Sequence, residues 1–325
     1  MAKTEEHCIG RAIRSVVEHV DAVFVVDTGS TDATKAVANK ATGSKPFGLR
    51  DLPWEGFGKT RTEALKEAKF WTEANTDAAP EDVLFLLLDA DDEITSFPDV
   101  SALARGPDCF SAVVRSGSLV YPQIKLLRSS VDFIWVGSTH EQLQCVNRDA
   151  VVYALPGFEY KIGEDSSRRL SGEKTTGDIE LLQMELEEDP ANARAWFYLG
   201  ISYRVVGLYS EAVVAFEERI TLQQQDPSLC MEEAYLSMVW SGDSLARAGK
   251  NDEAILQWLQ AIDYRQHRQE AYTLLAEMFI RAKRPVLATL FASRSLYYEN
   301  YTSDRLFVDS SCTTRCLAVL QGKLL

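Results

Sequence analysis

The sequence lacks several patterns that mark large classes of protein. Its six cysteines are scattered and form no CxxC pair, so neither a zinc site nor a disulfide framework is indicated. Basic residues are too few to balance the acidic ones, and the net charge of −14 argues against a nucleic-acid or anionic-membrane surface. No apolar run approaches membrane-spanning length and the first residues lack a signal-peptide core, so we expect a cytoplasmic protein without a membrane span.

The length and composition fit a folded protein with more than one domain. A chain of 325 residues with 46% hydrophobic residues can form two domains, each with its own core. Residues 156–177 are polar and glycine-rich with few apolar positions, which predicts a linker. We therefore expect an α/β domain over residues 1–155 and an all-helical domain over residues 178–325.

An apolar run at residues 84–88 leads directly into an acidic segment, Asp89 to Glu93. Such a run predicts a strand buried on both faces, as in a parallel sheet. Asp89 and Asp91 form a DxD pattern and point the same way on an extended chain. Two converging carboxylates suit a hard cation such as Mg²⁺ or Mn²⁺. A solvated acidic turn after a buried strand explains the same residues.

A second apolar strand, residues 22–26, ends in the polar turn Asp27-Thr28-Gly29-Ser30-Thr31-Asp32. A helix over about residues 32–41 would follow, which makes a βα unit. The turn offers backbone N–H groups and carboxylates to a ligand at the strand's C-terminal end. The same residues also explain a simple helix cap.

Two further features place charged residues at the ends of predicted helices and strands. Arg61 lies in the first turn of a predicted helix over residues 59–75, where a cation opposes the helix dipole; either a nearby anion or exposure to solvent explains it. The strand at residues 133–136 delivers His140 and Glu141 to a loop, where they could act as a metal ligand and a base or be structural.

The second half of the chain carries a helix-turn-helix repeat of about 34 residues. Small residues recur where paired helices cross, and aromatic residues recur between adjacent repeats. We expect these repeats to bind a peptide or protein, or to support the first domain or a dimer. The repeat positions are Trp196, Leu199, Gly200, Tyr203, Gly207, Ala212 and Phe216, then Gly242, Leu245, Gly249, Ala254, Trp258 and Ala261, then Tyr272, Leu275, Ala276, Phe279, Ala288 and Ala292.

Together, VVDTGSTD at residues 25–32, LDADDE at 88–93 and His140-Glu141 resemble the family-2 glycosyltransferases of the A-type nucleotide-sugar fold. The repeats resemble the group of that family with a tetratricopeptide array behind the transferase domain. The opening residues 3–11 and the segment containing Trp54, Phe57 and Arg61 are also similar to that group, with Thr4 and Thr62 where asparagine is usual.

The resemblance implies a donor site. Asp27 would bind the base of a nucleotide-sugar, most simply the uracil of a UDP-sugar. Asp32 and Arg61 would lie near the nucleotide, and Asp89 would face the ribose or the metal.

The resemblance also implies a metal-dependent, inverting transfer of a hexosyl group to a peptide, protein or glycan acceptor. Asp91 would bind Mn²⁺ or Mg²⁺, and His140 would complete the metal or diphosphate site. Glu141 is the candidate base that deprotonates the acceptor, with Asp92 or Glu93 as the fallback.

One departure from the family pattern raises an alternative function. That fold places an interior strand before residues 3–6, and the residues here hold no apolar run to make it. The chain could therefore be a degenerate transferase domain that serves as a protein-binding scaffold. A phosphoryl-transfer enzyme is a third reading, against which the missing GxxxxGK[ST] loop counts.

Overall fold

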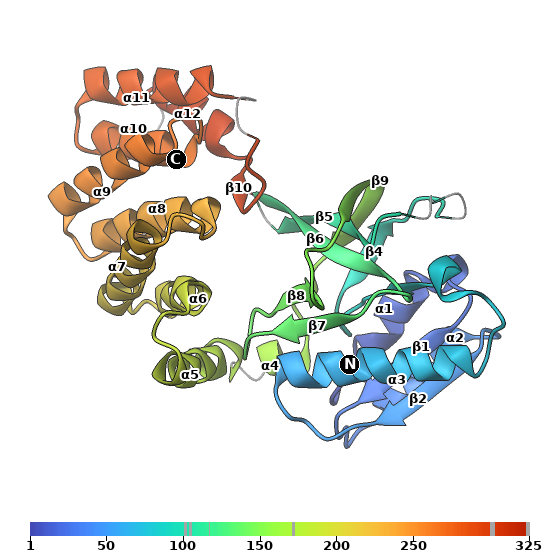
Figure 1. Ribbon diagram of the computed structural model, residues 1–325. Helices are drawn as coiled ribbons and strands as arrows, with labels where there is room; N and C mark the ends of the chain where they lie inside the picture. Colours follow the sequence, from blue (N-terminus) through green and yellow to red (C-terminus); the bar gives the residue numbers. More distant parts are fainter. Residues whose placement is uncertain (101–102, 104–105, 117, 171–172, 300–302, 323–325) are drawn as a thin grey trace. The chain divides into compact units, whose positions relative to one another are not determined.

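The computed structural model describes residues 1–325 apart from 101–102, 104–105, 117, 171–172, 300–302 and 323–325. The chain forms two compact units, one of residues 1–116 with 121–174 and one of residues 117–120 with 175–325 (Figure 1). The first unit mixes strands with helices and the second is built from helices. The predicted fold class, an α/β region followed by an all-helical region, is confirmed.

The first unit begins with a small parallel sheet flanked by helices. Strand β2 follows β1 in parallel pairing, as the predicted βα unit requires. Gly48 in β2 allows close packing of a helix, because a Cβ there would lie 2.7 Å from the ring of Trp71 in α3. The elements are α1 (Ile9–Arg14), β1 (Val23–Asp27), α2 (Thr34–Thr42), β2 (Phe47–Asp51) and α3 (Phe57–Glu73).

A second sheet in this unit is mixed, whereas the apolar run at residues 84–88 predicted a parallel sheet. Strand β5 pairs in parallel with β9, whereas β4 pairs antiparallel with β9 and β3 pairs antiparallel with β6. Short connections between successive strands leave no room for the crossover helix that parallel neighbours need. The strands are β3 (Leu84–Leu86), β4 (Glu93–Ser96), β5 (Cys109–Ser116), β6 (Leu119–Arg128), β7 (Phe133–Val136), β8 (Gln142–Cys145) and β9 (Val152–Lys161).

The strand expected to be buried on both faces is shorter and more exposed than predicted. Its residues Leu84–Leu86 are all half-buried. The reason is that β3 pairs with β6 on one side and has no strand on its other side within the described residues. Strand β1 has a similar edge, where a single bridge joins Ala2 to Asp27. The two strands that carry the candidate site therefore lie in separate sheets.

The predicted linker, residues 156–177, is wrong over most of its length. Strand β9 runs to Lys161, and its residues Phe158 and Tyr160 are buried in the core of the mixed sheet. Helix α4 (Ser167–Leu170) also belongs to the first unit, which extends to Lys174 instead of ending at residue 155. In a strand only every second side chain faces the core, so a polar composition concealed the strand.

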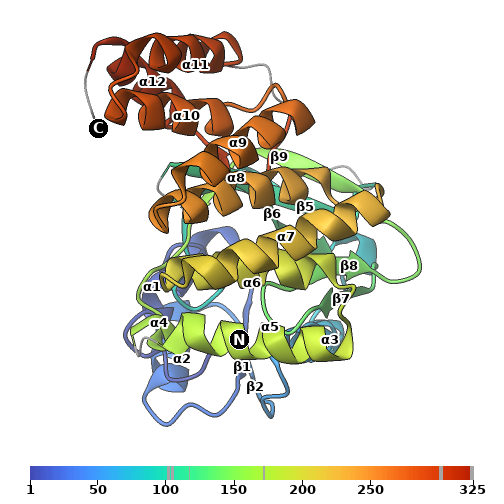
Figure 2. The same ribbon diagram turned by 90° about the vertical axis from the view of Figure 1, so that its left-hand side faces the viewer.

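The second unit stacks helices in antiparallel pairs (Figures 1 and 2). A Cβ at Gly200 would lie 2.6 Å from the ring of Phe216, and one at Gly242 would lie 2.4 Å from Trp258, as the repeat pattern predicted. Among the described residues no helix is long and apolar enough to cross a membrane. The elements are α5 (Glu173–Glu188), α6 (Ala193–Val205), α7 (Tyr209–Gln225), α8 (Met231–Arg247), α9 (Asn251–Tyr264), α10 (Glu270–Arg281), α11 (Pro285–Tyr297), β10 (Val308–Asp309) and α12 (Cys312–Leu320).

Candidate functional site

The turn after β1 places one carboxylate oxygen in an unusual environment. Asp27 is only 1% exposed, and its Oδ1 accepts hydrogen bonds from the backbone N–H groups of Gly29 (3.0 Å) and Ser30 (2.9 Å). Burial alone would raise the pKa of Asp27, but the hydrogen bonds from Ser30 and Gly29 hold it below its ordinary value. The other oxygen, Oδ2, is buried and has no hydrogen-bond partner among the described residues. An ionised, buried acceptor without a donor is costly unless a ligand supplies one.

The second aspartate of this turn has a structural role at the start of α2. Oδ1 of Asp32 accepts a hydrogen bond from the backbone N–H of Thr34 (3.0 Å), and Oδ2 accepts one from that of Glu6 (3.2 Å). Oε2 of Glu6 in turn accepts from the backbone N–H of Ala33 (2.8 Å). These contacts hold Asp32 at the start of α2, but the N-cap residue of this helix is Ala33 and not Asp32. The predicted place of Asp32 near a nucleotide stays a prediction.

The basic residue in the first turns of α3 lies beside the anion that its position suggested. Nη2 of Arg61 is 2.8 Å from Oδ1 of Asp89, and Nε is 3.4 Å from Oε1 of Glu141. Burial would raise the pKa of Asp89, but Arg61 and, more weakly, Lys125 hold it well below its usual range. The structure thus brings together three residues that the sequence predicted from separate segments.

Asp92 faces the interior of the first unit. Nζ of Lys125 donates a 2.9 Å hydrogen bond to Oδ2 of Asp92, and the side chains are 4% and 3% exposed. Burial raises the pKa of Asp92 in spite of this cation. Asp92 is thus paired with Lys125 inside the first unit, and its role as the fallback base stays a prediction.

The predicted metal ligands do not form a compact set of three. The ligand atoms of Asp89, Asp91 and His140 are not within 4.8 Å of one another, and Asp89 is already paired with Arg61. Asp91 is buried, with its backbone oxygen accepting a 3.1 Å hydrogen bond from Arg11. Two carboxylates have the hard-oxygen chemistry that Mg²⁺ and Mn²⁺ prefer. The described residues therefore fit a cation that takes its other ligands from a bound phosphate, but not an independent protein cage.

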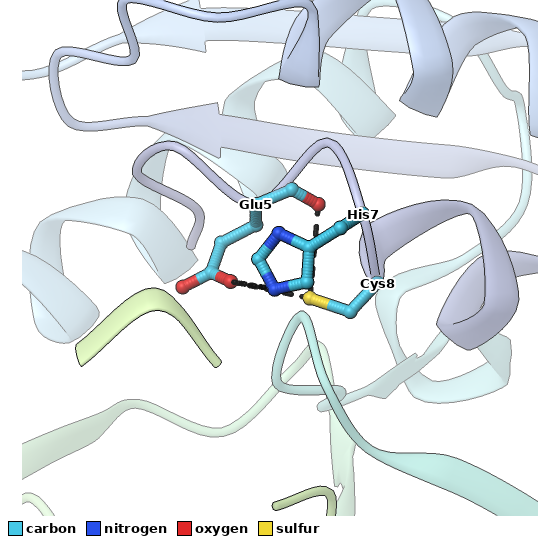
Figure 3. A group of neighbouring side chains, drawn as sticks. All are labelled: Glu5, His7 and Cys8. Carbon is cyan, nitrogen blue, oxygen red and sulfur yellow. Dashed lines mark hydrogen bonds and ion pairs between the residues drawn. The ribbon is translucent and has the colours of Figure 1, made fainter. Parts of the chain in front are cut away.

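Figure 3 shows the group whose ligand-type atoms do lie within 4.8 Å of one another in the described chain, namely Glu5, His7 and Cys8. Sγ of Cys8 donates to Oε2 of Glu5 (3.1 Å), and burial raises the pKa of the Cys8 thiol. Nε2 of His7 lies 2.5 Å from the backbone oxygen of Asp165, and Glu5 also accepts from the backbone N–H of Ser167 (3.1 Å). These protein contacts hold the first loop of the chain against the segment after β9 without requiring a metal.

Two charged partners of the site were missed from the sequence. Lys125 lies within β6, between Ile124 and Leu126. Asp165 lies in the segment interpreted as a linker, and it binds Arg11 through both of its carboxylate oxygens (2.6 and 2.8 Å). A lysine flanked by apolar residues in a strand was the available signal for the first, and nothing local marked the second.

Comparisons with known families agree with this two-part construction. Residues 1–104 match the family model described as glycosyl transferase family 2. Residues 179–228 and 241–303 match a tetratricopeptide repeat model. The chain joins a family-2 glycosyltransferase region to tetratricopeptide repeats. The glycosyltransferase region includes β1, α3 and the Asp89 segment, but the match ends before His140 and Glu141.

Solved structures similar to this chain include two of MamA. One, "Crystal structure of MamA protein", is 16% identical, with a TM-score of 0.36, and the match covers 48% of this chain and 83% of that one. Another, "MamA MSR-1 C2", is 19% identical, with a TM-score of 0.33, and covers 40% and 70%. No curated protein matches the chain.

Proposed function

We propose that the first unit is a glycosyltransferase that moves a sugar from a nucleotide-sugar, most simply a UDP-sugar, to a peptide, protein or glycan. The observation that carries this proposal is the buried, unpartnered Oδ2 of Asp27 at the C-terminal end of β1. Ligands of α/β folds bind at this end of the strands. The glycosyl transferase family 2 match over the same residues supports the reaction class.

Asp27 would recognise the base of the donor. A uracil ring carries one N–H group between two carbonyl oxygens, and that N–H would donate to Oδ2. The low pKa of Asp27 keeps this oxygen an acceptor at neutral pH. Ser30 and Gly29 hold the carboxylate in place through Oδ1, so little ordering is needed when the base binds.

Arg61 would face the diphosphate. Its guanidinium lies between the carboxylates of Asp89 and Glu141, and its Nε makes no hydrogen bond among the described residues. Asp89 and Asp91 are the proposed ligands of a Mn²⁺ or Mg²⁺ ion, with His140 beside the diphosphate. Such an ion, when bound with the donor, would neutralise part of the charge that develops on the diphosphate.

Glu141 is the proposed base. Its carboxylate would take the proton from the acceptor hydroxyl while that oxygen bonds to the anomeric carbon. The bond from the anomeric carbon to the diphosphate breaks at the same time, and the electron pair leaves with the nucleoside diphosphate. Attack from the side opposite the leaving group inverts the configuration of the sugar. Nε of Arg61 lies 3.4 Å from the Glu141 carboxylate and would help to hold it in place.

Calorimetric titration with UDP-sugars tests the donor site. Replacing Asp27 by asparagine removes a charged acceptor, which should weaken donor binding by roughly 10-fold to 100-fold. The matched control is Asp77→Asn, because Asp77 is exposed in the loop after α3. Repeating the titration with Mn²⁺ and with a chelator tests the proposed cation separately. Equal affinities for wild type and Asp27→Asn would refute the base assignment.

The scaffold reading remains the second candidate. It is favoured by the separate sheets of β1 and β3 and by the pairing of Asp89 and Asp92 with protein cations. A scaffold would bind a partner through its repeats without consuming a donor. Release of UDP from any UDP-sugar by the purified chain, above a Glu141→Gln control, would exclude it.

A further inference from the structure

A short extended segment of the second unit lies across the first helices of successive repeats. This segment, residues 304–309, is called the strap. It follows the tetratricopeptide match, which ends at residue 303, and it includes β10. Leu306 and Phe307 pack against the hydrophobic core to which helices α5 to α10 contribute. Stacked helical repeats create extended surfaces that such proteins use for binding.

The strap is held in the way that proteins hold an extended peptide. Oε2 of Glu232, at the start of α8, accepts hydrogen bonds from the backbone N–H groups of Arg305 (2.8 Å) and Leu306 (2.6 Å). Arg268 donates two 3.3 Å hydrogen bonds to the backbone oxygen of Leu306. These hydrogen bonds are made to backbone atoms of the strap, so another extended segment could form the same bonds.

Side chains at two positions of the strap add specificity. The Asp304 carboxylate is bound by both ends of the Arg265 guanidinium, with Nε at 2.7 Å from Oδ2. The Phe307 ring lies 5.8 Å from that of Trp240 and 6.5 Å from that of Phe197. The strap therefore presents an aspartate, followed three residues later by an aromatic ring, to this surface.

The backbone conformation of Phe307 differs from that of the helices on which the strap packs. Its φ of 45° is in the left-handed region, which is unfavourable for a bulky residue. The ring contacts with Trp240 and Phe197 offset that strain. After Phe307, β10 pairs with Leu119 and Val120, and the backbone N–H of Asp309 donates to Oε1 of Glu270 (3.1 Å).

We propose that the face formed by α6, α8 and α10 is a peptide-binding surface for an aspartate-x-x-phenylalanine segment, and that the strap is its resident, displaceable ligand. A protein segment of this chemistry competes with the strap. Because the strap is tethered, it competes at a high effective concentration, and a free peptide binds the intact chain weakly.

The test uses a fluorescent peptide of residues 303–310 and the full-length chain. Phe307→Ala weakens the strap but leaves the helical face intact, so the peptide should bind this variant at least about tenfold more tightly than wild type. Asp304→Asn weakens the strap through a different contact and should act in the same direction. Leu290→Ala is the matched control, because Leu290 is 60% exposed on α11. A peptide with alanine in place of phenylalanine should not bind.

Fluorescence anisotropy measures the affinity, and circular dichroism checks the helices. Folded variants that bind the peptide no better than wild type would overturn the proposal. Loss of helical structure in both strap variants would overturn it too, because the strap would then be part of the core.

Discussion

The buried pair of Lys125 and Asp92 allows a sharp test of how the first unit is stabilised. Replacing Lys125 by methionine keeps the length of the side chain but leaves the Asp92 carboxylate buried without its cation. Both side chains are at most 4% exposed, so water cannot substitute for the lost partner. Breaking a buried pair on one side costs about 3–5 kcal/mol of the free energy of unfolding. The lysine also lies 4.4 Å from the centre of the Tyr160 ring, and that contact is lost as well.

The pH dependence of this variant has a definite sign. The pKa of Asp92 is already raised by burial, and removing Lys125 raises it further. The folded state then binds a proton that the unfolded state releases near the ordinary aspartate pKa of about 3.9. The stability lost in Lys125→Met should therefore grow as the pH rises above the raised pKa that Asp92 has in the folded wild type, and shrink as the pH falls toward that pKa.

The loss in the first unit alone is measured by unfolding the protein in urea and following the hydrogen exchange of peptides from β5, β6 and β9. Lys66→Met is the control, because Lys66 is exposed in α3 and its ion pair with Glu63 contributes at most about 0.5 kcal/mol. Replacing both members of the buried pair by methionine and leucine should recover most of the stability. A loss below about 1 kcal/mol for Lys125→Met, or one independent of pH, would refute the reasoning.

Three other predictions follow from single contacts. Gly163→Ala would place a Cβ 2.0 Å from the backbone oxygen of Asp91, so it should lower stability by about 1–3 kcal/mol and weaken donor binding, as urea unfolding and calorimetry would show. Gly200→Ala would place a Cβ 2.6 Å from the Phe216 ring, so it should lower the stability of the repeats by about 1–3 kcal/mol. Loss of the helical circular dichroism signal in urea measures this change, and an unchanged unfolding midpoint would contradict the packing. Arg61 holds the pKa of Asp89 low. The stability that Asp89 contributes should therefore be complete above about pH 4 and should be lost only as the pH falls through its lowered pKa. Urea unfolding of Asp89→Asn and wild type at several pH values tests this.

Local patterns in the sequence predicted the elements that depend on neighbouring residues. The apolar run before Asp27 forms β1, and Arg61 in the first turns of α3 does have an anion beside it. The repeat spacing predicted a small residue where paired helices cross, and Gly200 lies close to the Phe216 ring of the helix paired with its own.

Local patterns could not predict contacts between segments that are distant in the sequence. Lys125 neutralises Asp92 from another strand, and no periodicity relates the two positions. Phe158 and Tyr160 lie in a polar segment, so their burial in β9 was hidden by the exposed residues between them. The strap follows the repeats without a repeat pattern of its own, and only folding shows that Phe307 meets Trp240.

Release of UDP from UDP-sugars tests the central claim most directly. The purified chain, supplied with Mn²⁺ and a panel of UDP-sugars, should release UDP, and Glu141→Gln should slow that release by at least about 100-fold while donor binding is retained. No release above the buffer rate with any donor, together with no calorimetric binding of UDP, would contradict the assignment of Asp27, Arg61 and Glu141 to a nucleotide-sugar site.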